Sequence, residues 1–104
     1  MQARVVTFEG SSQGGPAAPQ RFQQEVLPKL EAQSGFRGAL VLLDRAGGKL
    51  LGITLWDSEG DREKATQAME ATRQANAASM GATSSAEDFE VVAQVMPGTP
   101  AGTA

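Results

Sequence analysis

The chain has 104 residues, of which 40% are hydrophobic and 20% are charged, and its formal net charge is −3. This composition is typical of one small folded domain, and the nine basic residues are too scattered to predict a nucleic-acid-binding surface. The sequence contains no histidine, cysteine or tyrosine, which excludes histidine bases, thiol nucleophiles and nearly all zinc or copper sites. We therefore expect a protein that holds no metal and no cofactor.

The sequence shows no sign of a membrane segment or of export. No apolar run approaches the length that spans a bilayer, and the N-terminal "MQARVVTFEG" lacks a basic stretch followed by a long apolar one. The absence of cysteine is typical of a reducing compartment. We expect a cytoplasmic protein that does not contact membranes.

The first elements in chain order are a strand and a loop. Residues 3–9, "ARVVTFE", are rich in β-branched and aromatic side chains, which favour a strand. Residues 10–19, "GSSQGGPAAP", contain too much Gly, Ser and Pro for a regular element. Because ten residues make a long connection in so small a domain, we interpret this loop as a mobile lid or a plain linker.

A helix is predicted next, from Pro19 to Ser34. Its apolar residues recur at spacings of three and four, as Phe22, Val26, Leu27 and Leu30. Pro28 has no backbone N–H, so we expect it to kink the helix or to split it near Gln24. Gly35 suits the left-handed residue that ends a helix.

A hairpin is predicted within residues 36–56, where two strand-like runs flank Gly47 and Gly48 as a two-residue turn. Directly opposed residues of a hairpin share a face of the sheet. In this register one face carries Leu40, Leu42, Asp44, Leu51, Ile53 and Leu55. The other face carries Ala39, Val41, Leu43, Gly52, Thr54 and Trp56. We expect the aliphatic face to pack on the helices, and we expect a second layer over the Trp56 face because it is too apolar to face water.

A second helix is predicted from Glu59 to Met80, with Asp57 or Ser58 as its N-cap and Gly81 as its left-handed end. Its inward face is expected to carry Ala65, Ala68, Met69, Thr72, Asn76 and Met80. The acids near its start lack the spacing of a calcium-binding loop, and we interpret them as charges that favour the positive end of the helix dipole. They are Asp57, Glu59, Asp61 and Glu63.

The last element is a predicted strand over residues 88–95, "DFEVVAQV", followed by a flexible tail over residues 97–104. Residues 1–96 then form a single domain with the order β-α-β-β-α-β. This order predicts a ferredoxin-like α+β fold, in which a four-stranded antiparallel sheet has two helices on one face. Because no residues remain to cover the other face, we expect the chain to form a homodimer through it.

With this order of elements, the chain resembles the dimeric α/β-barrel superfamily of antibiotic-biosynthesis-monooxygenase type, over about residues 3–96. The resemblance rests on the element order, on "SGFRG" at the start of the second strand, and on "ITLWDSEGD" between the third strand and the second helix. It implies a dimer with a cavity between each sheet and its helices, or at the barrel. Members of this superfamily include oxygenases that act on phenolic or polycyclic substrates without metal or flavin, haem-degrading proteins, and proteins without known activity.

The resemblance also suggests site residues. The cofactor-independent oxygenases rely on Asn, Trp, Arg and Tyr around the cavity, and this chain has no Tyr. The candidates that remain are Trp56, Asn76, Arg37, Arg73 and the neighbouring Thr54. The haem-degrading branch resembles the chain at Trp56 but binds iron through a histidine on the following helix, and this chain has no histidine.

Two interpretations of function follow. In the first, a flat apolar compound binds near Trp56 and Asn76, and O₂ oxidises an electron-rich aromatic while Asn76 and an arginine stabilise the developing oxyanion. In the second, Trp56 only fills the core or the dimer interface, and the protein is a non-catalytic dimer with a structural or ligand-binding role. An open cavity with Trp56 and Asn76 on its wall favours the first interpretation, and a filled interior favours the second.

Overall fold

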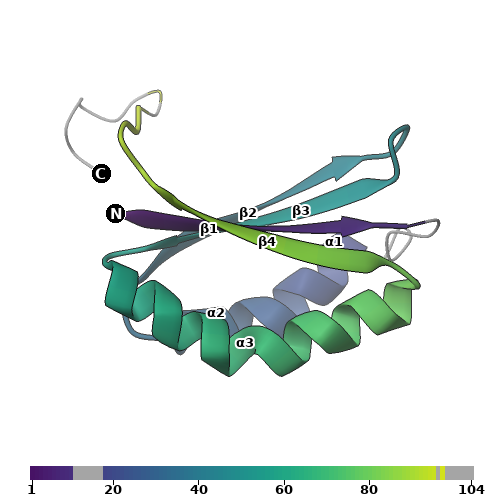
Figure 1. The fold of residues 1–104 in the computed structure, drawn as a ribbon, viewed down its shortest axis with the longest axis horizontal. Coiled ribbons are helices and arrows are strands. Elements are labelled where there is room, and N and C mark those ends of the chain that lie inside the picture. Colours follow the sequence, from purple (N-terminus) through teal and green to yellow (C-terminus); the bar gives the residue numbers. More distant parts are fainter. Residues whose placement is uncertain (11–17, 96, 98–104) are drawn as a thin grey trace.

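The four strands form one antiparallel sheet, and both helical segments lie on the same side of it (Figure 1). The computed structural model describes residues 1–10, 18–95 and 97. The strands lie in the order β2-β3-β1-β4, and they are β1 (Gln2–Glu9), β2 (Phe36–Asp44), β3 (Lys49–Trp56) and β4 (Thr83–Glu90). This is the ferredoxin-like α+β fold that the element order predicts.

The first helical segment runs from residue 18 to residue 31 and changes its pitch on the way. It consists of α1 (Ala18–Arg21), the π-helical turn η2 (Phe22–Val26) and α2 (Leu27–Glu31). The Leu27 N–H donates to the carbonyl oxygen of Phe22, five residues back. Pro28 follows directly, and its missing N–H and bulky ring disrupt the α-helical pattern. The predicted interruption of the helix near Gln24 is therefore confirmed.

The ends of this segment differ from the predicted ones. The helix ends at Glu31 rather than Ser34, so Gly35 does not terminate it. Gly35 instead adopts a φ of 79° in the connection to β2, and its carbonyl oxygen accepts a hydrogen bond from the Asp57 N–H at 2.8 Å. Most of the predicted loop, residues 11–17, lies outside the described residues, and the helix already begins at residue 18.

The second helix, α3 (Glu59–Met80), has the predicted bounds and caps. The Ser58 hydroxyl accepts from the Asp61 N–H at 3.1 Å, and Gly81 ends the helix with a φ of 62°. Ala68 is exposed, contrary to prediction, because the inward stripe is centred between Met69 and Arg73 and Ala68 falls outside it. The residues buried on α3 are Arg62, Ala65, Ala77 and Met80.

The acids around the start of α3 have partners within the protein. Asp57 forms an ion pair with Arg37, and Asp61 accepts from the Ser58 hydroxyl. The carboxylates of Glu59 and Glu63 lie 3.7 and 4.0 Å from the Arg62 guanidinium. In addition, Glu59 and Asp61 lie in the first turn of α3, where the helix dipole favours negative charge.

The hairpin differs from its predicted register by two residues. Asp44 pairs with Lys49, so the turn contains four residues, 45–48, rather than two. The Asp44 carboxylate accepts from the Gly47 N–H at 2.9 Å, which stabilises this longer turn. Because side chains alternate with a period of two, the shift leaves each residue on the same face as its predicted companions.

The assignment of the two sheet faces is wrong, however. Gly52, Thr54 and Trp56 face the helices of their own chain. The aliphatic face is open instead, and Leu40 and Leu42 on it are 59% and 45% exposed. Large helix side chains, among them Leu30 and Met69, pack with Trp56 on the covered face of the sheet.

The last strand also differs from prediction. β4 spans Thr83–Glu90 rather than residues 88–95, and it pairs with β1 along its whole length. β1 begins at Gln2, so the pairing ends there, and only one further bond follows, from the Val91 N–H to the Met1 carbonyl at 2.9 Å. The apolar residues after 90 thus have no strand beside them within the described chain. Of the predicted tail, only residue 97 is described.

The core lies between the sheet and the helices. Leu30, Trp56 and Ala65 form its buried centre, with Phe22, Val26, Phe36 and Met69 packed around them. Among the helices of the described residues, none combines the length and the apolar character needed to cross a bilayer.

Candidate functional site

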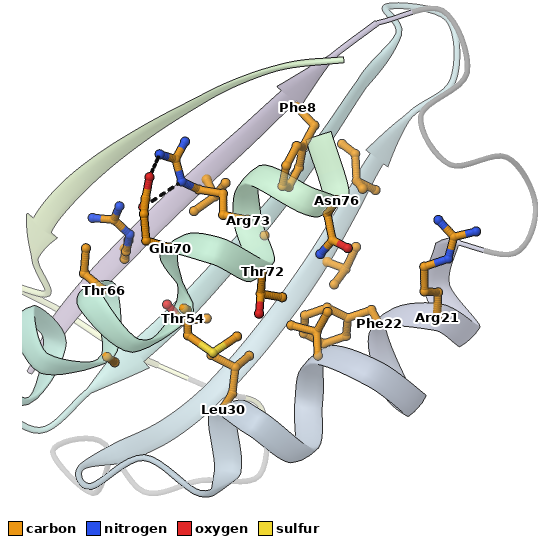
Figure 2. A pocket seen from close by; sticks show the side chains of 18 of the residues that line it. Phe8, Arg21, Phe22, Leu30, Thr54, Thr66, Glu70, Thr72, Arg73 and Asn76 are labelled. Atoms are coloured by element: carbon orange, nitrogen blue, oxygen red, sulfur yellow. Dashed lines mark hydrogen bonds and ion pairs between the residues drawn. The ribbon is translucent and has the colours of Figure 1, made fainter. Parts of the chain in front are cut away.

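A cavity of about 140 Å³ lies between the sheet and the helices that cover it (Figure 2). The strands line it with Arg4, Val6, Phe8, Val41, Leu50, Gly52, Thr54 and Trp56. The first helical segment adds Arg21, Phe22, Val26 and Leu30. The remaining wall is α3, with Arg62, Ala65, Thr66, Met69, Glu70, Thr72, Arg73, Asn76 and Met80. More than half of these residues are apolar, which suits a ligand with an apolar body.

Gly52 leaves the floor of this cavity open. It lies in the middle of β3, between Val6 on β1 and Val41 on β2. A Cβ atom placed on Gly52 has no heavy atom within 4 Å. A larger residue at this position would therefore fill cavity space without a clash at its Cβ.

Trp56 is a core residue and a wall of the cavity at once. It is 1% exposed, and its ring meets Phe36 edge-on with centroids 5.5 Å apart. The indole N–H donates to the Thr54 hydroxyl at 2.9 Å, so the polar atom of the ring is satisfied. The expectation that Trp56 and Thr54 face a second chain is wrong, because the helices of the same chain cover them.

Asn76, the only asparagine of the chain, lies on the inward face of α3 as predicted. Figure 2 shows its side chain directed from α3 toward the cavity. Its backbone carbonyl accepts from the Ser79 hydroxyl at 3.2 Å, but no hydrogen bond joins its side-chain amide to another described residue. The amide can therefore donate and accept hydrogen bonds with a bound molecule.

Arg73 also lines the cavity, but each of its three guanidinium nitrogens already donates a hydrogen bond. Its Nε donates to Glu70 at 3.2 Å, its Nη2 donates to the same carboxylate, and its Nη1 donates to the Ser84 hydroxyl at 2.8 Å. This hydrogen-bonded fork holds the pKa of Glu70 below its ordinary value. Glu70 is thus ionised at neutral pH and is a weak base.

Arg37 lies outside the cavity, which corrects its place among the predicted site residues. It occupies a bulge of β2 opposite the end of β3, and its half-exposed side chain pairs with Asp57 at 2.7 Å. The bulge breaks the strand alternation, and the Arg37 side chain pairs with Asp57, just before α3, rather than lining the cavity.

An ion cluster that was not predicted joins β4 to two arginines of the cavity wall. Asp88 on β4 binds both Arg62, at 2.7 Å, and Arg4, at 3.0 Å. Arg62 is 9% exposed, and its Nε has no partner among the described residues. Sequence periodicity contains the signal for both arginines, because Arg4 alternates with Val6 and Arg62 precedes Ala65 by one turn.

Arg21 is a further cavity residue that was not predicted. It ends α1, and its Nη1 donates to the Ser79 hydroxyl of α3 at 3.4 Å. Its position one residue before the stripe of Phe22 and Val26 gave no sign that it lines the cavity.

The comparisons with known proteins bear on the fold. No family model and no curated protein matches the chain. Among solved structures, the monooxygenase of the gene ActVA-Orf6 from Streptomyces coelicolor, in complex with nanaomycin D, superposes with a TM-score of 0.72. It is 18% identical, over 92% of this chain and 91% of that chain. NE2512, a protein of unknown function from Nitrosomonas europaea, is 24% identical with a TM-score of 0.70, over 94% and 95% of the two chains.

The chain has the ferredoxin-like fold of antibiotic-biosynthesis-monooxygenase-type proteins. The resemblance inferred from the element order and from "ITLWDSEGD" is thereby confirmed. The heme-degrader MhuD from Mycobacterium tuberculosis, with two hemes bound in its active site, is another similar structure of this kind. It is 28% identical with a TM-score of 0.61, over 92% of this chain and 100% of that chain.

The residues of this chain do not fit a haem. Haem iron is held in proteins mainly by histidine, cysteine, tyrosine or a methionine paired with histidine. The chain has no residue of the first three types, and the cavity wall offers only the thioethers of Met69 and Met80. We therefore derive no chemistry through a haem.

Proposed function

We propose that this chain is a monooxygenase-like protein that binds a flat aromatic molecule and oxidises it without a cofactor. The observation that carries the proposal is the largely apolar cavity, with the Trp56 ring in its wall and the Asn76 amide free to bind a ligand. The open floor at Gly52 supports it, because a purely structural interior would be filled at this position.

The cavity volume indicates the size of the bound group. Its 140 Å³ is close to the roughly 150 Å³ of an engineered apolar cavity that binds benzene. Sites for drug-sized ligands are larger, at roughly 300 Å³ or more. One aromatic ring therefore fills the enclosed space, and further rings of a polycyclic ligand would extend beyond it.

The proposed reaction takes its electrons from the substrate. A phenol takes up one O₂, one oxygen atom enters the ring as a second carbonyl, and the other oxygen leaves as water, so that a quinone is formed. The Asn76 amide donates to the oxygen on which negative charge develops. Since Glu70 is a weak base beside Arg73, a substrate that is already ionised suits this site better than one that must lose a proton there.

Fluorescence of the single tryptophan tests the proposal directly. Phenols of one to four rings are titrated into the wild-type protein, and the Gly52→Val variant serves as the filled-cavity control. Wild-type Trp56 is expected to be quenched by at least one phenol, and Gly52→Val is expected to lose this response while remaining folded. O₂ uptake is then measured on each phenol that binds, with one O₂ expected per quinone.

The alternative is a non-catalytic dimer, and the exposed apolar residues of the open sheet face support it. The open sheet face carries exposed Leu40, Leu42 and Phe89, and exposed apolar groups of this kind mark an interaction surface. A homodimer through this face, opposite the helices, is compatible with either function and remains part of the proposal, as does the cytoplasmic location. One similar structure is a dimeric ferredoxin-like protein from an uncultured marine organism. Binding without O₂ uptake would favour the non-catalytic function.

A further inference from the structure

The cavity wall carries an excess of basic side chains, unlike the chain as a whole. The chain as a whole is acidic, with a net charge of −3, but four arginines and a single carboxylate line the cavity. The four arginines are Arg4, Arg21, Arg62 and Arg73. A wall of this kind attracts anions, provided that at least one arginine is not already neutralised.

Three of these arginines are neutralised by acids of the chain itself. Arg73 is paired with Glu70, and Arg4 and Arg62 share Asp88. Arg62 additionally has two glutamates of the first turns of α3 within 4.0 Å. The charge of these three arginines is thus used within the fold, and it leaves little attraction for a bound anion.

Arg21 is the exception. All twelve aspartate and glutamate residues of the sequence belong to the described residues, and none of them forms an ion pair with Arg21. The hydrogen bond that the structure gives its guanidinium is the long one to the Ser79 hydroxyl, at 3.4 Å. A guanidinium presents five N–H donors, so most of its hydrogen-bonding capacity is unused.

Arg21 and Asn76 are held at the same end of the cavity by a relay. The Arg21 guanidinium donates to the Ser79 hydroxyl, which in turn donates to the Asn76 backbone carbonyl at 3.2 Å. Figure 2 shows Asn76 on α3 and Arg21 on the facing helical segment, which also carries Phe22. This end therefore offers a charged donor and an amide donor beside an aromatic ring.

We propose that the ligand of this cavity is an aromatic anion, a ring that carries a carboxylate or phenolate oxygen, and that Arg21 and Asn76 recognise the charged oxygen. This inference rests on the proposed aromatic-binding function and adds the charge of the ligand and the residue that selects it. The apolar wall holds the ring, while the planar guanidinium of Arg21 binds the oxygen at the edge of the ring. An ionised ligand also removes the need for a base in the cavity.

The test compares benzoate with benzamide, which has nearly the same shape but no charge. Binding is followed by NMR through the indole N–H of Trp56, which gives a single resonance because the chain has one tryptophan. The wild type is expected to bind benzoate about tenfold more tightly than benzamide, as for a hydrogen bond to a charged group. Arg21→Met is expected to abolish the preference, and raised salt is expected to reduce it in the wild type.

Lys29→Met is the matched control. Lys29 lies on the same helical segment, and it also donates one 3.4 Å hydrogen bond to a hydroxyl of α3, that of Thr72, but it does not line the cavity. This variant is expected to keep the preference for benzoate. Arg21→Gln, which keeps a donor but no charge, provides the same measurement if Arg21→Met fails to fold.

The outcomes separate this inference from the proposed function. Equal binding of benzoate and benzamide by the wild type, or an undiminished preference in Arg21→Met, would overturn the inference and leave an aromatic site standing. Absence of binding by both compounds, with phenols also failing to quench Trp56, would overturn the inference and the proposed function together.

Discussion

The indole N–H of Trp56 donates to the hydroxyl of Thr54, two residues earlier on the same strand, at 2.9 Å. This bond places a polar pair inside an otherwise apolar part of the core, next to Leu30 and Ala65. It satisfies the one polar atom of a ring that is 1% exposed, and so it allows a tryptophan to occupy this position.

Thr54→Val tests how much this bond contributes to the free energy of unfolding. Valine keeps the shape of threonine but cannot accept, so the buried indole N–H loses its partner. We expect the free energy of unfolding to fall by about 1–3 kcal/mol, measured by urea denaturation followed through Trp56 fluorescence. Thr72→Val is the control, because the Thr72 hydroxyl accepts only a 3.4 Å bond from the exposed Lys29. Equal losses in the two variants would contradict the role given to the bond.

The two ion pairs with a 2.7 Å contact differ in burial, and the difference predicts their importance. Asp88→Asn weakens the partner of the buried Arg62, and we expect a loss of about 1–3 kcal/mol in the free energy of unfolding. Asp57→Asn breaks the half-exposed pair with Arg37, and a loss of less than about 1 kcal/mol is expected. Chemical denaturation measures the loss in both variants. A larger loss in Asp57→Asn than in Asp88→Asn would refute the prediction.

Glu70 gives the fold a pH dependence whose sign can be stated. The hydrogen bond from Arg73 is the main cause that lowers the pKa of Glu70 below its ordinary value of 4.5. A carboxylate with a lowered folded pKa stabilises the fold above its unfolded pKa, and this stabilisation is lost as the pH falls through the folded value. Glu70→Gln should therefore lower the thermal midpoint at pH 7, with a difference that shrinks below pH 4.5.

The same substitution in an Arg73→Met background provides the control for this pH dependence. Without Arg73 the carboxylate of Glu70 loses the main donor that lowers its pKa, while the Gln74 amide still donates to it at 3.1 Å. The difference in thermal midpoint between the Arg73→Met protein and the double variant that also carries Glu70→Gln should then vary less with pH in this window than it does when Arg73 is present. An undiminished pH dependence after the loss of Arg73 would show that another group is its main cause.

The open sheet face predicts the oligomeric state. Light scattering is expected to give about twice the 10.8 kDa mass of the chain at micromolar concentration. Changing both Leu40 and Leu42 to Lys places charges on this face and is expected to yield monomers, whereas changing both to Met should keep the dimer. A monomeric wild-type protein would contradict the proposed dimer interface at Leu40 and Leu42.

Local patterns in the sequence were sufficient for the elements themselves. The helix from Glu59 to Met80 has the predicted bounds because its signals are local: the Ser58 hydroxyl caps the first turn and Gly81 ends the last one. The interruption before Pro28 is local too, because it follows from a missing N–H. The inward position of Asn76 on α3 was also predicted from helical periodicity, and it places Asn76 on the cavity wall.

Contacts between distant parts of the chain decided which face of the hairpin is covered, where β4 ends and where Arg21 lies. Alternation divided the hairpin residues into two sets, but both sets are apolar, and only packing against Phe22, Leu30 and Met69 selects the Trp56 set for the helices. The end of β4 depends on where β1 begins, since a strand needs a partner for its backbone groups. The unpaired charge of Arg21 is likewise a tertiary result. Its sequence neighbourhood resembles any exposed helix start, and only the folded chain places it on the cavity wall without an acidic partner among the described residues.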